Sequence, residues 1–180
     1  MKTFTLLASL LLATATTTTA LAEPFHADVE IDPTAYALDG NSIHVGAGTG
    51  RFRVDLGSFA EHLPQFFHGH DGFDVSFDGF GVKLQAFLAD DQHGWFGGID
   101  GGELRVLAQR RGTDLADRQR QISVGVHAGY RFTLPDGFYI TPWIGVGYDF
   151  GTRDVTFQGA TYHADPISVF PAVHLGFRFR

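Results

Sequence analysis

The last sixty residues of the chain alternate apolar positions with small or polar ones over three consecutive runs. The apolar positions are Ile122, Val124, Val126, Ala128, Tyr130, Phe132 and Leu134, then Phe138, Ile140, Pro142, Ile144, Val146, Tyr148 and Phe150, and finally Ile167, Val169, Pro171, Val173, Leu175, Phe177 and Phe179. A side-chain period of two predicts β-strands with one apolar face each. Each run covers about thirteen residues, more than the roughly 9–11 residues that a tilted strand needs to cross a bilayer core.

The residues between those apolar positions decide between two interpretations. A soluble barrel or sandwich would turn this second face to water, where Lys, Glu, Thr and Gln are usual. Here small residues dominate, with an occasional ring or charge, as in Ser123, Gly125, His127, Gly129 and Arg131. Glycine weakens a strand but suits the narrow lumen of a small barrel. The pattern therefore favours an all-β transmembrane barrel with its apolar face toward lipid, and a soluble periplasmic lipid-binding barrel is the alternative.

Following the alternation toward the N-terminus predicts eight strands in an antiparallel up-and-down order. We place them within 28–38 and at 42–48, 51–59, 73–88, 94–108, 121–134, 138–151 and 166–180. Pro33 interrupts the first pattern, so six strands are the alternative if 28–48 does not form two. Within 73–88 the apolar positions shift from odd to even numbers, which predicts a β-bulge near Asp78 and Gly79.

The connections between these strands alternate between short and long. The segments 60–72, 109–120 and 152–165 are expected to be long loops, whereas Thr49-Gly50 and Pro135-Asp136-Gly137 have the residues of tight turns. Outer-membrane barrels have short periplasmic turns and long external loops. Both termini are therefore expected in the periplasm.

The N-terminus predicts export. Lys2 precedes an apolar run at 4–13 (FTLLASLLLA), and Ala20-Leu21-Ala22 has the form of a cleavage site. The run is too short for a membrane-spanning helix. We therefore expect a cleaved signal peptide at 1–22 and one barrel domain at 23–180.

Composition changes this picture little. The chain has 18 Phe and 23 Gly, which lipid-facing rings and lumen-facing glycines would explain. It has no cysteine, so neither disulfides nor a lipoprotein anchor is expected. The formal net charge is −7, or −8 without Lys2, which argues against nucleic-acid binding. No cofactor is expected.

Two segments resemble parts of known membrane barrels. The residues GYRF at 129–132 and YITPWIGVGYDF at 139–150 resemble a hairpin of small bacterial outer-membrane barrels, the OmpA/OmpW-like proteins and the broad outer membrane protein beta-barrel domain group. The ending HLGFRF at 174–179 looks like their C-terminal strand, which the barrel insertion machinery recognises, although Arg180 follows here. The resemblance implies a fold and a Gram-negative outer-membrane location, but no activity, because the group has diverse functions.

One predicted external loop carries imidazole and carboxylate groups, namely His62, His68, His70 and Asp71. Such groups can bind zinc or copper. The spacing follows no strict ligand pattern, so a solvated loop is the preferred interpretation and these four residues are weak metal candidates.

Charged residues on the second face of the strands are predicted to line the lumen. They are Arg53, Asp55, Lys83, His127, Arg131, Asp149, His174 and Arg178. Because their three strands are neighbours, Arg131, Asp149 and Arg178 are expected to share a site. Ion pairs would satisfy these charges in a narrow interior and close it, and a small conducting or proton-sensing pore is the alternative.

The segment 109–120 is rich in charge. It contains Arg110, Arg111, Arg118 and Arg120 together with Asp114 and Asp117. Arginine forks suit the phosphates of lipopolysaccharide, and a solvated charged loop is the alternative.

A lipid A-modifying enzyme would need a serine with a histidine and a carboxylate. Ser123 with His127, and Ser168 with His174, lie on one strand face each, but no motif singles them out. The sequence therefore predicts a monomeric, integral outer-membrane barrel with a structural or surface-interaction role. Its expected partners are outer-membrane lipid and lipopolysaccharide; a pore, an enzyme and a soluble barrel are the alternatives.

Overall fold

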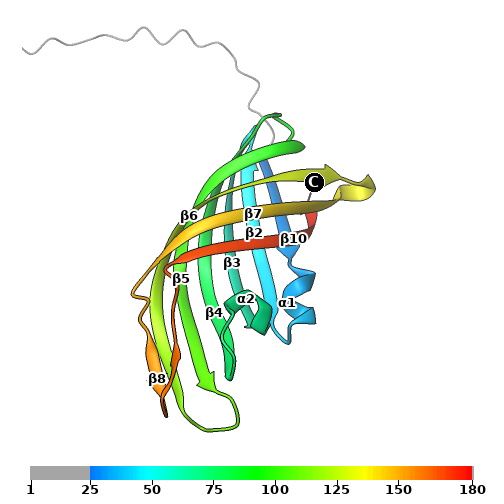
Figure 1. Ribbon diagram of the computed structural model, residues 1–180. Coiled ribbons are helices and arrows are strands. Elements are labelled where there is room, and N and C mark those ends of the chain that lie inside the picture. Colours follow the sequence, from blue (N-terminus) through cyan, green and yellow to red (C-terminus); the bar gives the residue numbers. More distant parts are fainter. Residues whose placement is uncertain (1–24, 180) are drawn as a thin grey trace, which may run out of the picture.

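The computed structural model describes residues 25–179 and folds them into one closed antiparallel barrel (Figure 1). The barrel strands are β1 (Phe25–Ile31), β2 (Asn41–Thr49), β3 (Phe52–Leu63), β4 (Phe73–Phe87), β5 (Gly94–Arg110), β6 (Ala116–Thr133), β7 (Phe138–Phe150) and β10 (Ile167–Phe179). They follow one another around the ring, and β10 pairs with β1 to close it. The prediction of an eight-stranded up-and-down barrel is confirmed. The expected signal peptide at 1–22 and Arg180 lie outside the described residues.

The two ends of the barrel differ. The turn end holds both Phe25 and Phe179, the β2–β3 turn, and the short 3-10 helix η1 (Pro135–Gly137) between β6 and β7. The loop end holds two short helices, α1 (Pro33–Ala37) and α2 (Gln65–His68), and a hairpin of β8 (Val155–Phe157) and β9 (Ala160–Tyr162), as Figure 1 shows. The three longest connections, at 32–40, 64–72 and 151–166, therefore all lie at the loop end.

The first strand ends earlier than expected. β1 stops at Ile31, and Pro33 begins α1 instead of continuing a strand to residue 38. Proline suits the first turn of a helix because that turn needs no N–H from it. The carboxylate of Asp32 caps the helix by accepting the N–H of Thr34 at 2.8 Å.

Most of the predicted loop at 109–120 is strand. β5 continues to Arg110 and β6 begins at Ala116, so only 111–115 connects them. β3 likewise continues to Leu63 inside the predicted loop at 60–72. Of the charged residues in these segments, Arg118 and Arg120 occupy the outer face beyond the apolar zone, whereas Glu61 is buried on the inner face.

The predicted bulge near Asp78 and Gly79 is wrong. Asp78 pairs with Ala60 on β3 and with Arg105 on β5, and the pairing continues without a shift on both sides. The odd-numbered residues of β4 therefore point inward along its whole length. What changes along β4 is the face that carries the apolar residues. Near the loop end Phe73 is buried on the inner face, whereas Phe80 lies on the outer face and is 58% exposed.

The outside of the barrel carries a continuous apolar zone, here called the outer belt. It consists of Ile43, Val45, Phe52, Val54, Leu56, Phe80, Val82, Leu84, Trp95, Ile99, Ile122, Val124, Val126, Phe132, Phe138, Ile144, Val146, Tyr148, Phe150, Ile167, Val169, Val173, Leu175 and Phe179, each at least 40% exposed. A soluble barrel would bury such residues, whereas a transmembrane barrel presents them to lipid. The belt therefore contradicts the soluble alternative.

A second apolar region, the loop-end core, lies inside the barrel at its loop end. Its buried members are Phe73 and Val75 on β4, Ala108 on β5 and Tyr162 on β9. Phe157 and Ala160 of the hairpin pack against them, so β8 and β9 cover the inner face of β4 and β5 at the loop end. Burial raises the pKa of the Tyr162 phenol, so this ring stays neutral.

Candidate functional site in the barrel lumen

The lumen between the middle of the barrel and its turn end is filled by charged side chains, and Arg53 is their centre. Arg53 lies on β3 and its side chain is 1% exposed. Its guanidinium donates to Asp28 on β1 (2.5 Å), to Asp55 on β3 (3.0 Å) and to the Gln85 amide oxygen on β4 (2.7 Å). Gly46 on β2 makes room for this group, because a Cβ there would overlap Arg53 and Asp28. Arg53 thus ties three strands together from within.

A second arginine reaches into the same network from the opposite wall. Arg131 on β6 is fully buried and donates to Glu30 on β1 at 3.0 Å. Its guanidinium also stacks over the Tyr139 ring, 4.1 Å from the ring centroid. Glu30 lies 3.3 Å from Arg53 as well, so this carboxylate bridges the two arginines across the lumen.

Three imidazoles each face a carboxylate in this network. His44 Nδ1 lies 2.9 Å from Asp55, His127 Nδ1 lies 2.7 Å from Asp100, and His174 Nδ1 lies 2.9 Å from Glu30. The rings of His44 and His174 are 4.6 Å apart. Lys83 Nζ completes the set, 3.7 Å from Asp55 and 4.4 Å from the centroid of the Trp143 ring. The carboxylates are therefore surrounded by cations and by groups that can become cations.

The expected grouping of Arg131, Asp149 and Arg178 is wrong. Asp149 pairs with Ser123 on β6, eight residues from Arg131, which corresponds to about 26 Å along the strand. Arg178 lies at the turn end, where it donates to the Asp91 carbonyl at 2.9 Å and to Gln92 at 3.0 Å. Facing the same lumen does not bring residues together when their strands place them at different heights.

Sequence reasoning missed five members of the network. They are Asp28, Glu30, His44, Gln85 and Asp100, which provide most of the acceptors for Arg53, Arg131 and the histidines. Asp28 and Glu30 flank Val29 with period two, and His44 occupies the face of Gly46 and Gly48, so the signal was present in the sequence. The strand containing the two acids was weakly marked because Pro33 followed closely.

Comparison with known proteins addresses the fold. No protein-family model matches the chain, and no curated protein matches it significantly. Among solved structures, neisserial surface protein A (NspA) matches with a TM-score of 0.52 at 12% identity, over 86% of this chain and 94% of that one. A major outer membrane protein from Thermus thermophilus (TM-score 0.49, 11% identity) and the N-terminal β-barrel domain of OprF from Pseudomonas aeruginosa (0.45, 14%) also match over 86% of this chain and 98% and 96% of theirs.

The chain has the fold of a small outer-membrane barrel. The resemblance inferred from the hairpin and the C-terminal strand is thus confirmed at the level of fold. At this identity the likeness carries no activity with it.

The histidine-rich segment does not assemble a metal centre within the described residues. His62 lies on the outer side of β3, whereas His68 and His70 lie near the hairpin and Asp71 accepts from Gln65. His70 Nε2 is 2.8 Å from the carbonyl oxygen of His163. Burial, then the nearby His70 and Arg111, lower the pKa of His68.

The serine–histidine pairs are not in contact. Ser123 and His127 are four positions apart and Ser168 and His174 are six positions apart, which along a strand correspond to about 13 and 20 Å. Both histidines instead face carboxylates.

Among the described helices, none is long and apolar enough to cross a membrane.

Proposed function

We propose that this protein is an integral outer-membrane barrel that is exported by a cleaved signal peptide and presents its loop end to the exterior. Its lumen is closed, and its role is structural and in surface interaction rather than in transport. The outer belt, the tight turns at the end that holds both termini, and the fold likeness support this location. Cell fractionation, with N-terminal sequencing of the purified protein, tests it; a soluble periplasmic protein would contradict it.

A continuous series of side-chain contacts crosses the lumen and is the main support for a closed barrel. It runs from Arg131 on β6 to Glu30 on β1, Arg53 on β3, Gln85 on β4 and back to His127 on β6. The last contact joins Gln85 Nε2 and His127 Nε2 at 3.4 Å. Small eight-stranded barrels have interiors just wide enough for side chains to fill, and these side chains are buried.

A small pore is the second candidate. Asp100 faces the lumen, yet its side chain is 27% exposed, and that of Lys83 is 13% exposed. The interior is thus more open beside these residues than around Arg53. A pore would require the Arg131–Glu30–Arg53 bridge to open.

Planar-bilayer recording separates the two functions. The refolded wild-type protein should show no discrete conductance steps, and frequent steps would contradict the closed lumen. The paired change Arg131→Ala and Glu30→Gln removes the bridge and should produce steps. Arg51→Ala, which alters an exposed pair with Asp90 outside the lumen, is the matched control and should stay silent. Heat-modifiable migration in gels verifies folding of each variant.

A further inference from the structure

Three arginines lie together on the outer face of the barrel near its loop end. Arg105 on β5 and Arg120 on β6 are direct cross-strand partners, and Arg118 lies two residues from Arg120 on the same strand. The side chains of Arg105, Arg120 and Arg118 are 51%, 72% and 59% exposed, respectively. Their neighbours on β6, Gln119 and Gln121, point inward and are buried. The three guanidiniums therefore project from one patch, here called the arginine face.

The arginine face has more cationic charge than its neighbours neutralise. Like charges directly opposite each other destabilise a strand pair, which is the arrangement of Arg105 and Arg120. Arg120 donates to Glu103 at 2.5 Å, Arg105 pairs with Asp78, and Arg118 lies 3.9 Å from the same Asp78. Three guanidiniums thus share two carboxylates. Each has five N–H donors, so donors remain for an additional anion.

The arginine face lies where the outer belt ends. In the next row toward the turn end, Glu103 pairs with Phe80 on β4 and with Ile122 on β6, and Ile122 pairs with Phe150 on β7. Those three apolar residues belong to the outer belt. In a bilayer the polar head groups begin where the apolar zone stops. The guanidiniums are therefore at the height of lipid phosphates.

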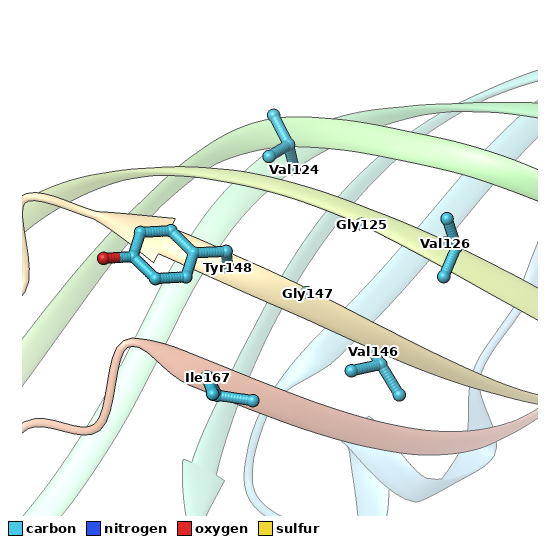
Figure 2. A pocket seen from close by; sticks show the side chains of 7 residues that line it. All are labelled: Val124, Gly125, Val126, Val146, Gly147, Tyr148 and Ile167. Atoms are coloured by element: carbon cyan, nitrogen blue, oxygen red, sulfur yellow. The ribbon is translucent and has the colours of Figure 1, made fainter.

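A shallow apolar depression lies on the outer belt, on the turn-end side of the arginine face (Figure 2). Its volume is about 460 Å³, and the side chains around it include Val124 and Val126 on β6, Val146 and Tyr148 on β7, and Ile167 on β10. Arg120 and Val124 are four residues apart on β6, about 13 Å along the strand. A cationic group beside an apolar groove matches a phosphorylated head group joined to an acyl chain.

We propose that the arginine face and this depression together bind one lipid A moiety of lipopolysaccharide. Its phosphates lie on Arg105, Arg118 and Arg120, where planar guanidiniums form paired, charge-assisted hydrogen bonds with phosphate oxygens. One acyl chain lies in the depression. The assignment of lipid A as the ligand rests on the proposed outer-membrane location with the loop end outside, because the outer leaflet of that membrane contains lipopolysaccharide.

The test is a titration of the purified, micelle-embedded protein with diphosphorylated lipid A. The double variant Arg118→Gln and Arg120→Gln should bind at least about tenfold more weakly, since hydrogen bonds to charged groups are lost. The matched double variant Arg51→Gln and Arg153→Gln removes two exposed arginines that pair with Asp90 and Asp117 and do not belong to the arginine face. It should bind as the wild type does. Unchanged binding by the first pair, or equal loss in both, overturns the site.

Three further ligands identify what is recognised. Dephosphorylated lipid A should bind the wild type weakly, and inorganic phosphate should not compete, because the chain contributes too. Phosphatidylglycerol that binds as tightly as lipid A would overturn the assignment to lipopolysaccharide. Fractionation reports on the outer-membrane location independently, so failure of the location and failure of the site are distinguishable.

Discussion

Along β4 the two halves of the barrel wall have opposite polarity, although one strand runs through both. Around the turn end and the middle, apolar side chains point outward and charged ones point inward, as Val82 and Lys83 do on β4. Near the loop end of the same strand, Val75 points inward and is buried, while Asp74 points outward. The backbone register is continuous between them. The solvent outside the wall, and not the strand itself, sets the pattern.

In the proposed outer-membrane location, this inversion marks the boundary of the membrane along the sequence. Where the outside is lipid, apolar groups are favoured there, and the lumen has to satisfy polar groups internally. Where the outside is water, β4 and β5 bury an apolar core as a soluble barrel would, whereas β6 still turns Gln119 and Gln121 inward. The crossover on β4 falls between Asp78 and Phe80, and on β6 it falls between Arg120 and Ile122. The arginine face lies at this crossover.

The largest expected effect comes from breaking the buried network in the membrane half. Arg53→Ala leaves Asp28 as an uncompensated buried charge, and Asp55 keeps only Lys83 and His44. We therefore expect a loss of about 3–5 kcal/mol in the free energy of unfolding. Arg51→Ala removes an arginine two residues away whose pair with Asp90 is half-exposed, and should cost less than about 1 kcal/mol. Urea titration in lipid vesicles measures both. Equal losses would contradict a network-stabilised lumen.

A smaller effect tests the inversion itself by adding the same charge to the outer face at two heights. Val126→Arg places a cation in the outer belt and should destabilise the folded barrel by about 2–4 kcal/mol. Ser76→Arg places one on the outer face of β4 beyond the crossover, between Asp74 and Asp78, and should change stability by less than about 0.5 kcal/mol. The same urea titration applies. If the Ser76→Arg variant were as unstable as Val126→Arg, the outer face of β4 at residue 76 would be in contact with lipid and not with water, which contradicts the inferred boundary.

The inversion also explains what the sequence could and could not predict. The outer face of runs such as 122–134 has the same environment along its whole length, so the side-chain period of two predicts those strands correctly. The shift from Phe77 to Phe80 crosses the boundary, so it reflects a change of environment and not the predicted bulge. Charges at 116–120 looked like a loop because outward Arg118 and Arg120 meet water and not lipid. Height within the lumen depends on register across strands, which no local pattern contains, so the Arg131–Glu30 contact could not be predicted.

The smallest expected effect compares one pair type in the two regions. Asp154 and His163 join the ends of the β8–β9 hairpin segment in water, with Oδ2 and Nδ1 2.7 Å apart, whereas Asp55 and His44 form a similar pair in the buried lumen. The hydrogen bond with His163, and then the one from the Ala164 N–H, hold the pKa of Asp154 below its usual range. The stabilisation is therefore fully present above the ordinary pKa of an aspartate, about 3.9, and is lost as the pH falls through the lowered value.

The amide proton of Ala164 reports on this carboxylate, which accepts its hydrogen bond at 3.1 Å. Its NMR chemical shift should move as the pH falls below about 4 and Asp154 takes up a proton. Asp154→Asn should abolish the movement, and the unfolding midpoint of the barrel should hardly respond, because exposed pairs are screened by water. An unfolding midpoint that follows this titration would show that the loop end and the membrane half unfold as one unit.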